Sequence, residues 1–216
     1  MDEIESFLDG LAAATPTPGG GGAAAMAAAM GSALLEMVAG LTHTRRKYAD
    51  VREEVADIKA QAEKLRAELI QLVEDDAYVY QRVITVLQHR TERNDKTVIQ
   101  AIEDALIGAA QVPLNVAQLS LEVAQLGERL ASIGLAHAAS DAAAACHVAE
   151  AAAHISRLNI LTNLREVSNA KLKTSWQNKS KRIVNEVSAI AARTRLKVEE
   201  SLMAPPSQAK RRRRRK

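Results

Sequence analysis

Residues 48–87, YADVREEVADIKAQAEKLRAELIQLVEDDAYVYQRVITVL, contain neither proline nor glycine, and they decide the fold class. Their apolar residues recur at alternating steps of three and four, the spacing of one buried face on a long α-helix. That face consists of Val51, Val55, Ile58, Ala62, Leu65, Leu69, Leu72, Val79, Val83 and Val86. Continuing the same spacing beyond Leu72 places Asp76 on the face. The segment therefore predicts a long packed helix with a carboxylate among its buried residues.

Asp76 is compatible with two interpretations. A carboxylate that is buried without a partner is costly, so something must compensate its charge. In the first interpretation the carboxylate is structural, and a neighbouring helix supplies a salt bridge or a helix end to be capped. In the second it is an active-site carboxylate whose pKa is shifted by its surroundings.

The positions of proline and glycine divide the rest of the chain. Prolines occur only at 16, 18, 113, 205 and 206, and no glycine follows Gly134. Because these residues are the strongest breakers of helices, long uninterrupted helices are expected between them. The predicted helices cover 3–14, 23–42, 48–87, 96–111, 113–134, 140–164 and 169–203. We therefore expect an all-α bundle of long antiparallel helices, with residues 1–204 as one helical domain and 205–216 as a disordered basic tail.

Composition excludes several classes of protein. Alanine fills 41 of 216 positions, whereas Phe, Tyr and Trp together fill 5, which is incompatible with a β-sandwich or β-barrel. The single cysteine, Cys146, cannot form an internal disulfide, and the acidic N-terminus lacks the apolar core of a signal peptide. These features predict a cytoplasmic protein.

The positive net charge of +3 comes from the C-terminus. Lys210–Lys216 holds seven of the 29 basic residues, and the rest of the chain has a net charge of −4. Nucleic-acid binding is therefore not expected of the folded part. The tail could bind RNA, DNA or an acidic protein without sequence preference.

The predicted helix 23–42 carries one charged residue, Glu36. Small residues at Ala23, Ala27 and Gly31 would let another helix approach closely. A membrane span is the competing interpretation, but the charge-free run is short for a bilayer. We expect a central alanine-rich helix that is buried on all sides, and no membrane association.

Several polar segments are candidates for ligand binding. The glycines Gly19–Gly22 precede a helix N-terminus, where backbone N–H groups favour an anion, although the segment could equally be a flexible turn. The cations Arg45, Arg46 and Lys47 suit a helix C-terminus and could also receive carboxylates or phosphates.

Two further pairs of polar residues lie in the predicted helix 140–164. Ser140 and Asp141 suit the first turn of this helix as cap and dipole partner. Asn159 and Asn163 share one face of an apolar stretch, and their amides need partners on a ligand or a neighbouring helix. The five histidines show no metal-ligand spacing, so no metal site is predicted.

Taken in order, these segments resemble the cyclodeaminase/cyclohydrolase family of folate enzymes. The matching segments are Ser6–Ala12, Thr17–Gly21, Met37–Thr42, Arg45–Tyr48, Leu72–Ala77, Val112–Leu114, Ser140–Asp141 and Asn159–Leu164. The resemblance implies a dimeric all-helical fold and a tetrahydrofolate derivative as substrate, with no metal or redox cofactor. The implied reaction is either closure of the ring of formiminotetrahydrofolate with loss of ammonia, or hydrolysis of methenyltetrahydrofolate.

The resemblance implies a role for each candidate residue. Asp76 is the first candidate for the catalytic acid or base, and Asp141 is the second. Gly19, Gly20, Gly21, Gly22, Ser140, Asn159 and Asn163 would contact the substrate, and Arg45, Arg46 and Lys47 would receive the glutamate carboxylates of the folate. Gly22 stands where the family usually has serine, which leaves open an alternative of another class: a non-catalytic helical binding or scaffold protein.

Overall fold

The computed structural model describes residues 2–88 and 96–204. Its α-helices are α1 (Asp2–Ala12), α2 (Gly20–His43), α3 (Arg52–Gln88), α4 (Lys96–Ile133), α5 (Ala139–Asn163) and α6 (Ala170–Met203), and its 3₁₀ turns are η1 (Arg46–Val51), η2 (Ala136–Ala138) and η3 (Leu164–Glu166). These ranges contain no β-strand, so the predicted all-α fold is confirmed. The predicted polar break at 89–95 and the basic tail at 205–216 lie outside the described residues.

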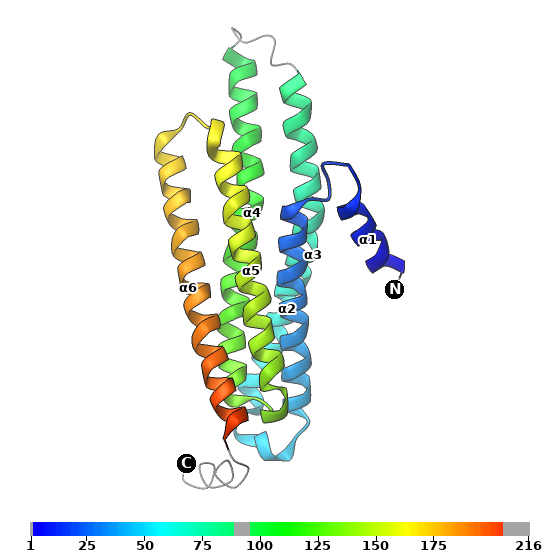
Figure 1. Cartoon of the computed structure of the whole chain (residues 1–216), viewed down its shortest axis with the longest axis vertical. Coiled ribbons are helices and arrows are strands. Elements are labelled where there is room, and N and C mark those ends of the chain that lie inside the picture. The colour runs from blue at the N-terminus through cyan, green and yellow to red at the C-terminus, as the bar shows by residue number, and fades with distance from the viewer. Residues whose placement is uncertain (1, 89–95, 205–216) are drawn as a thin grey trace.

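Helices α2, α3, α4 and α5 form an elongated bundle in which successive helices run in opposite directions (Figure 1). Helix α2 packs against α3 and α5, and α4 packs against the same two helices. Helix α6 lies across α4 and α5. Helix α1 makes only sparse contacts and projects from the bundle beside the N-terminal end of α2 (Figure 1).

The sequence predicted a helix break before Pro113, and this prediction is wrong. Helix α4 continues from Lys96 to Ile133 with Pro113 inside it. Proline has no N–H to donate to the carbonyl four residues earlier, which is that of Ala109. The side chain of Asn163, on α5, donates from Nδ2 to this carbonyl at 2.8 Å. A contact between helices thus replaces the hydrogen bond that proline removes.

Helix α2 differs from its prediction in two respects. It begins at Gly20, so Gly20–Gly22 form its first turn and do not belong to a preceding loop. It is also buried on only one side, where it meets α3 and α5, while Met30 is 53%, Met37 43% and Leu41 41% exposed. By length and composition α2 could cross a membrane, but half of its most apolar stretch is buried inside the bundle.

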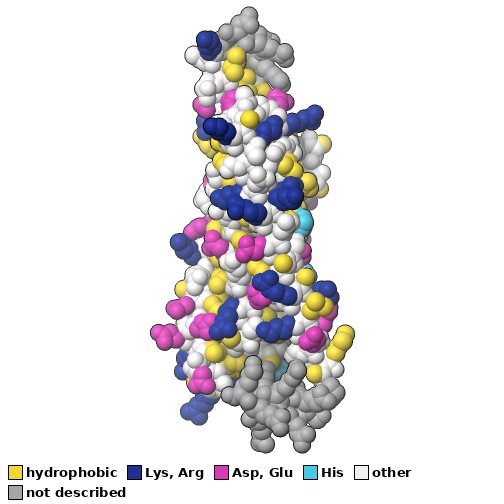
Figure 2. Space-filling view, turned by 90° about the vertical axis from the view of Figure 1, so that its left-hand side faces the viewer, with side chains coloured by type: hydrophobic (Ala, Val, Ile, Leu, Met, Phe, Trp, Pro, Cys, Tyr) yellow, Lys and Arg dark blue, Asp and Glu magenta, His cyan; other side chains and the backbone are white. Residues whose placement is uncertain are grey.

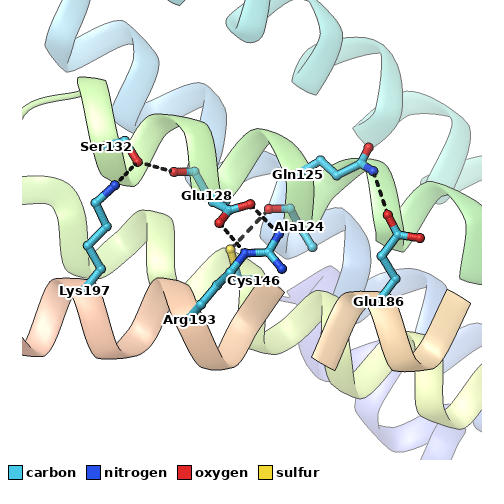
Figure 3. A network of polar contacts seen from close by, with 8 residues as sticks. All are labelled: Ala124, Gln125, Glu128, Ser132, Cys146, Glu186, Arg193 and Lys197. Carbon is cyan, nitrogen blue, oxygen red and sulfur yellow. Dashed lines mark hydrogen bonds and ion pairs between the residues drawn. The ribbon is translucent and has the colours of Figure 1, made fainter. Parts of the chain in front are cut away.

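Polar contacts attach α6 to α4 (Figure 3). Arg193 donates from Nε and Nη2 to the carboxylate of Glu128, and Lys197 donates to Ser132 Oγ. Cys146 is buried beneath this network and donates to the carbonyl of Ala124. The outer side of α6 carries interspersed charges of both signs, as expected of a face in contact with water (Figure 2).

Candidate active site

The predicted catalytic carboxylate and the predicted glycine segment meet in the structure. Asp76, on α3, reaches the N-terminus of α2, where the N–H of Gly22 donates to Asp76 Oδ2 at 3.0 Å. Gly19 occupies the cap position of α2 in an extended conformation and offers no side-chain acceptor. Asp76 therefore satisfies a donor of the first turn that the helix itself leaves unpaired.

Gly21 is required by the close approach of this carboxylate. A Cβ atom at Gly21 would lie 2.6 Å from Asp76 Oδ2, and it would lie closer still to Oδ1 and Cγ. Any other residue at this position would displace the Asp76 side chain. At Gly22, by contrast, the nearest atoms would be at an ordinary 3.7 Å.

The environment of Asp76 favours proton exchange. Burial raises the pKa of the Asp76 carboxyl above its ordinary value of 3.8, and the N–H of Gly22 opposes this by lowering the pKa. Within residues 2–88 and 96–204 no Lys, Arg or His forms an ion pair with Asp76. A half-buried carboxylate with a raised pKa and no cationic partner can both accept and donate a proton.

Asn159, on α5, is the third component of this site. A Cβ atom at Gly20 would lie 3.6 Å from Asn159 Nδ2, and this amide donates to the carbonyl of Ile155 at 3.2 Å. Among the described residues, the N–H groups of Gly20 and Gly21 have no acceptor. Helices α2, α3 and α5 thus bring together a titratable carboxylate, an amide and unused backbone donors.

A second group of candidates lies at the opposite end of α2. Arg45, Arg46 and Lys47 follow the C-terminus of α2, and each is exposed. They are separated from Gly20 by about 37 Å, at a rise of about 1.5 Å per residue. This distance exceeds the length of an extended tetrahydrofolate with one glutamate. The structure therefore does not bring these cations to Asp76 within one protomer.

Ser140 and Asp141 lie at this same end, in the first turn of α5. Ser140 is not the cap residue that the sequence predicted, because the turn η2 ends at Ala138 and places Ala138 in the cap position. Asp141 is likewise remote from Asp76, at the opposite end of α5 from Asn159. The predicted site residues thus divide into two groups at opposite ends of α2. The Asp76 group consists of Gly19–Gly22, Asp76 and Asn159, and the basic group consists of Arg45, Arg46 and Lys47, with Ser140 and Asp141 at the same end.

Sequence reasoning missed two residues that organise the basic end. Thr42 Oγ1 accepts from the N–H of Leu135 at 2.9 Å, and the Tyr48 hydroxyl accepts from the N–H of Ala136 at 3.1 Å. These contacts fix the α4–α5 turn against the C-terminal end of α2. Both residues belong to segments that resemble the folate-enzyme family. That resemblance was the feature of the sequence that could have identified them.

For Asn163 the structure shows the second of the two partners expected from the sequence, a neighbouring helix. Its amide is engaged with the Ala109 carbonyl of α4, so its role in the structure is to support the helix around Pro113. No group of three or more His, Cys, Asp or Glu side chains that could hold a metal ion occurs in the part of the chain that the structure describes.

The fold and the Asp76 group define an all-helical protein with a half-buried carboxylate of raised pKa at a glycine-rich helix N-terminus. The chain belongs to the formiminotransferase-cyclodeaminase family, whose profile matches residues 3–182.

Two relatives refine this assignment. A methenyltetrahydrofolate cyclohydrolase of Methylorubrum extorquens is 35% identical over 115 residues, which cover 52% of this chain and 55% of that protein. The alignment thus spans about half the length of that relative. The crystal structure of formiminotetrahydrofolate cyclodeaminase from Thermotoga maritima superimposes with a TM-score of 0.83 at 27% identity, over 91% of this chain and 96% of that one.

Proposed function

We propose that this protein is a folate one-carbon enzyme that hydrolyses 5,10-methenyltetrahydrofolate to 10-formyltetrahydrofolate. The observation that carries the proposal is the Asp76 carboxylate, which is half-buried, has a raised pKa and lies at the N-terminus of α2. The similarity to a methenyltetrahydrofolate cyclohydrolase favours hydrolysis over the other reactions of this substrate class.

In the proposed reaction Asp76 acts first as a base. It takes a proton from water while the water oxygen bonds to the methenyl carbon, which neutralises the cationic ring and gives a tetrahedral carbon. The bond from this carbon to N5 then breaks, and Asp76 returns the proton to N5. The hydroxyl proton leaves to solvent and the formyl group remains on N10. The N–H groups of Gly20 and Gly21 would stabilise charge on the substrate oxygen.

The second candidate reaction is the cyclodeaminase reaction, which the match to the Thermotoga maritima structure favours. There, N10 would attack the formimino carbon of 5-formiminotetrahydrofolate, and the proton that N10 loses would pass to the formimino nitrogen, which becomes an amino group on a tetrahedral carbon. Asp76, in its protonated form, would donate a proton to the departing nitrogen, so that ammonia leaves and the methenyl ring closes. The same carboxylate serves both reactions because each passes through a tetrahedral carbon between N5 and N10.

The proposal also covers the cofactor, the roles of the remaining site residues, the localisation and the oligomeric state. The substrate would be the folate itself, and Asp76 and solvent would provide the required proton transfers, so the proposed mechanism uses no cofactor. Arg45, Arg46 and Lys47 would receive the glutamate carboxylates, and Asp141 and Ser140 would support the substrate at that end. The enzyme would act in the cytoplasm as a homodimer that pairs through the exposed apolar face of α2.

The test follows the near-ultraviolet absorbance of the methenyl form. Faster loss of absorbance than in buffer, starting from methenyltetrahydrofolate, identifies the cyclohydrolase; a gain of absorbance from 5-formiminotetrahydrofolate identifies the cyclodeaminase. Asp76→Asn should lower kcat by about 10²–10⁴-fold. Asp75→Asn is the matched control, because Asp75 is hydrogen-bonded to Gln71 outside the site. Folate binding without turnover by the wild-type protein would instead favour the non-catalytic alternative.

A further inference from the structure

The outer face of α2 is apolar along its whole length. The face carries Ala23, Met26, Ala27, Met30, Ala33, Leu34, Met37 and Leu41. The single acidic residue of α2, Glu36, is half-buried and accepts two hydrogen bonds from Arg66 of α3, from Nε at 2.5 Å and from Nη2 at 3.3 Å. A continuous apolar face without charge is typical of a surface that another protein covers.

The charges at the two ends of this face are opposite in sign, which favours a second copy of the chain in antiparallel orientation as its partner. Beside the N-terminus of α2 lies α1, which carries Asp2, Glu3, Glu5 and Asp9 and no basic residue. Beyond the C-terminus of α2 lie Arg45, Arg46 and Lys47. Within residues 2–88 and 96–204, neither group forms an ion pair. Antiparallel pairing of two α2 helices places each acidic α1 beside the basic segment of the other subunit, whereas parallel pairing would oppose like charges.

The extent of the face sets the register of this pairing. The apolar face runs from Ala23 to Leu41, and its midpoint is at Ser32. In a two-fold symmetric interface the same surface is used by both subunits. A symmetry axis at the midpoint brings Ala23 opposite the partner subunit's Leu41, and brings Gly20 opposite the partner subunit's Thr44.

We propose that each active site of this enzyme is shared between two subunits. One subunit supplies Asp76, the N–H groups of Gly20 and Gly21, and Asn159. The other supplies the cations, because the partner subunit's Arg45 and the partner subunit's Arg46 follow directly after the residue that faces Gly20. The cations that lie about 37 Å away within a protomer thus reach the substrate from across the interface. This inference rests on the proposed folate function and assigns the glutamate end of the substrate to the second subunit.

The first experiment is complementation between two impaired variants. Asp76→Asn and the double variant Arg45→Gln/Arg46→Gln are co-expressed with different tags, and the mixed dimer is isolated through both tags. A shared site leaves one of its two sites with both Asp76 and the cations, so the mixed dimer should recover about half of the wild-type kcat/KM for polyglutamylated substrate. A site within one protomer predicts no more than the mean of the two parent variants. Wild-type kinetics in the double variant would also overturn the inference.

The second experiment needs no catalysis, so it separates this inference from the proposed function. Ala23 and Leu41 are about 27 Å apart along one helix, which is too far for a disulfide within a protomer. The variant Ala23→Cys/Leu41→Cys should form covalent dimers under mild oxidation, and each single variant should remain uncrosslinked. Crosslinks between two copies of position 23, or between two copies of position 41, in the single variants would indicate parallel pairing. An absence of any crosslink would exclude the proposed register. Either result refutes the shared site. An inactive wild-type protein that still gives the expected crosslinks would refute only the proposed function.

Discussion

Replacement of Gly21 by alanine tests whether the position of the Asp76 carboxylate is required for catalysis. The added methyl group would lie 2.6 Å from Asp76 Oδ2 and closer to the other carboxyl atoms, so the side chain must rotate away. Rotation breaks the hydrogen bond from the N–H of Gly22. It also withdraws the carboxylate from the unused N–H groups at the start of α2.

The expected change in stability is small because two effects oppose each other. Loss of a hydrogen bond to a charged group costs about 1.5–3 kcal/mol. Alanine is favoured over glycine in a helix by up to about 1 kcal/mol. The net destabilisation should therefore be about 0.5–3 kcal/mol, well within the stability of a folded domain of this length. The variant should fold, and its defect should be catalytic.

The expected change in rate is larger. A misplaced acid or base forfeits about 10²-fold or more in kcat, equivalent to about 2.7 kcal/mol of transition-state stabilisation. Rotation changes both the burial that raises the pKa of Asp76 and the Gly22 N–H contact that lowers it, so the acidic limb of the pH–rate profile should also shift. Steady-state absorbance assays across the pH range measure both effects, and urea unfolding measures the stability.

Gly108→Ala is the matched control for this substitution. It places the same methyl group in a helix, α4, where no heavy atom lies within 4 Å. It should leave activity unchanged and should stabilise the protein by up to about 1 kcal/mol. If Gly21→Ala kept the wild-type kcat/KM and pH profile, the carboxylate position would be irrelevant and the catalytic role of Asp76 would be refuted.

Three other substitutions or treatments test the remaining structural assignments. Asn163→Ala should destabilise the protein by about 1–3 kcal/mol, since it leaves the buried Ala109 carbonyl unpaired; in a Pro113→Ala background the restored N–H should remove most of this cost, and additive effects in urea unfolding would contradict the pairing. The raised pKa of Asp76 means that the folded state binds its proton more tightly than the unfolded state does. The stability this provides is present below pH 3.8 and is lost as pH rises through the folded pKa. Asp76→Asn should therefore be more stable than wild type at neutral pH, with the difference vanishing in acid; a variant less stable at pH 7 would show that the carboxylate is structural. Burial raises the pKa of Cys146 to about 12, so iodoacetamide at pH 8 should label the thiol only after unfolding, as read by mass spectrometry.

Features that follow from local pattern were predictable from the sequence. The absence of proline and glycine predicted the long helices, and the apolar face of α3 predicted a partly buried position for Asp76. The glycine segment predicted a helix N-terminus with free donors. Asp76 and the glycines were each identified from a different local rule, and the structure brings them into contact through Gly22.

Features that depend on contacts between distant segments were not predictable in this way. The continuity of α4 through Pro113 depends on an amide from α5 that replaces one hydrogen bond. The fixing of the α4–α5 turn depends on Thr42 and Tyr48, which lie far from it in sequence. The separation of Gly20 from Arg45, by contrast, was predictable from the sequence. The two residues lie at opposite ends of one predicted helix, so they had to be far apart.

That separation has a chemical advantage for the carboxylate. A cation fixed close to Asp76 would lower the pKa of its carboxyl and keep it ionised. The proposed folate substrate has an anionic glutamate end, which cations would hold. Cations at the far end of α2 cannot perturb the carboxylate of their own subunit, and across an antiparallel pair they approach the site next to Gly20, at its edge. The proposed arrangement can thus attract a multiply charged anion, while within one protomer burial and the N–H of Gly22 set the pKa of Asp76.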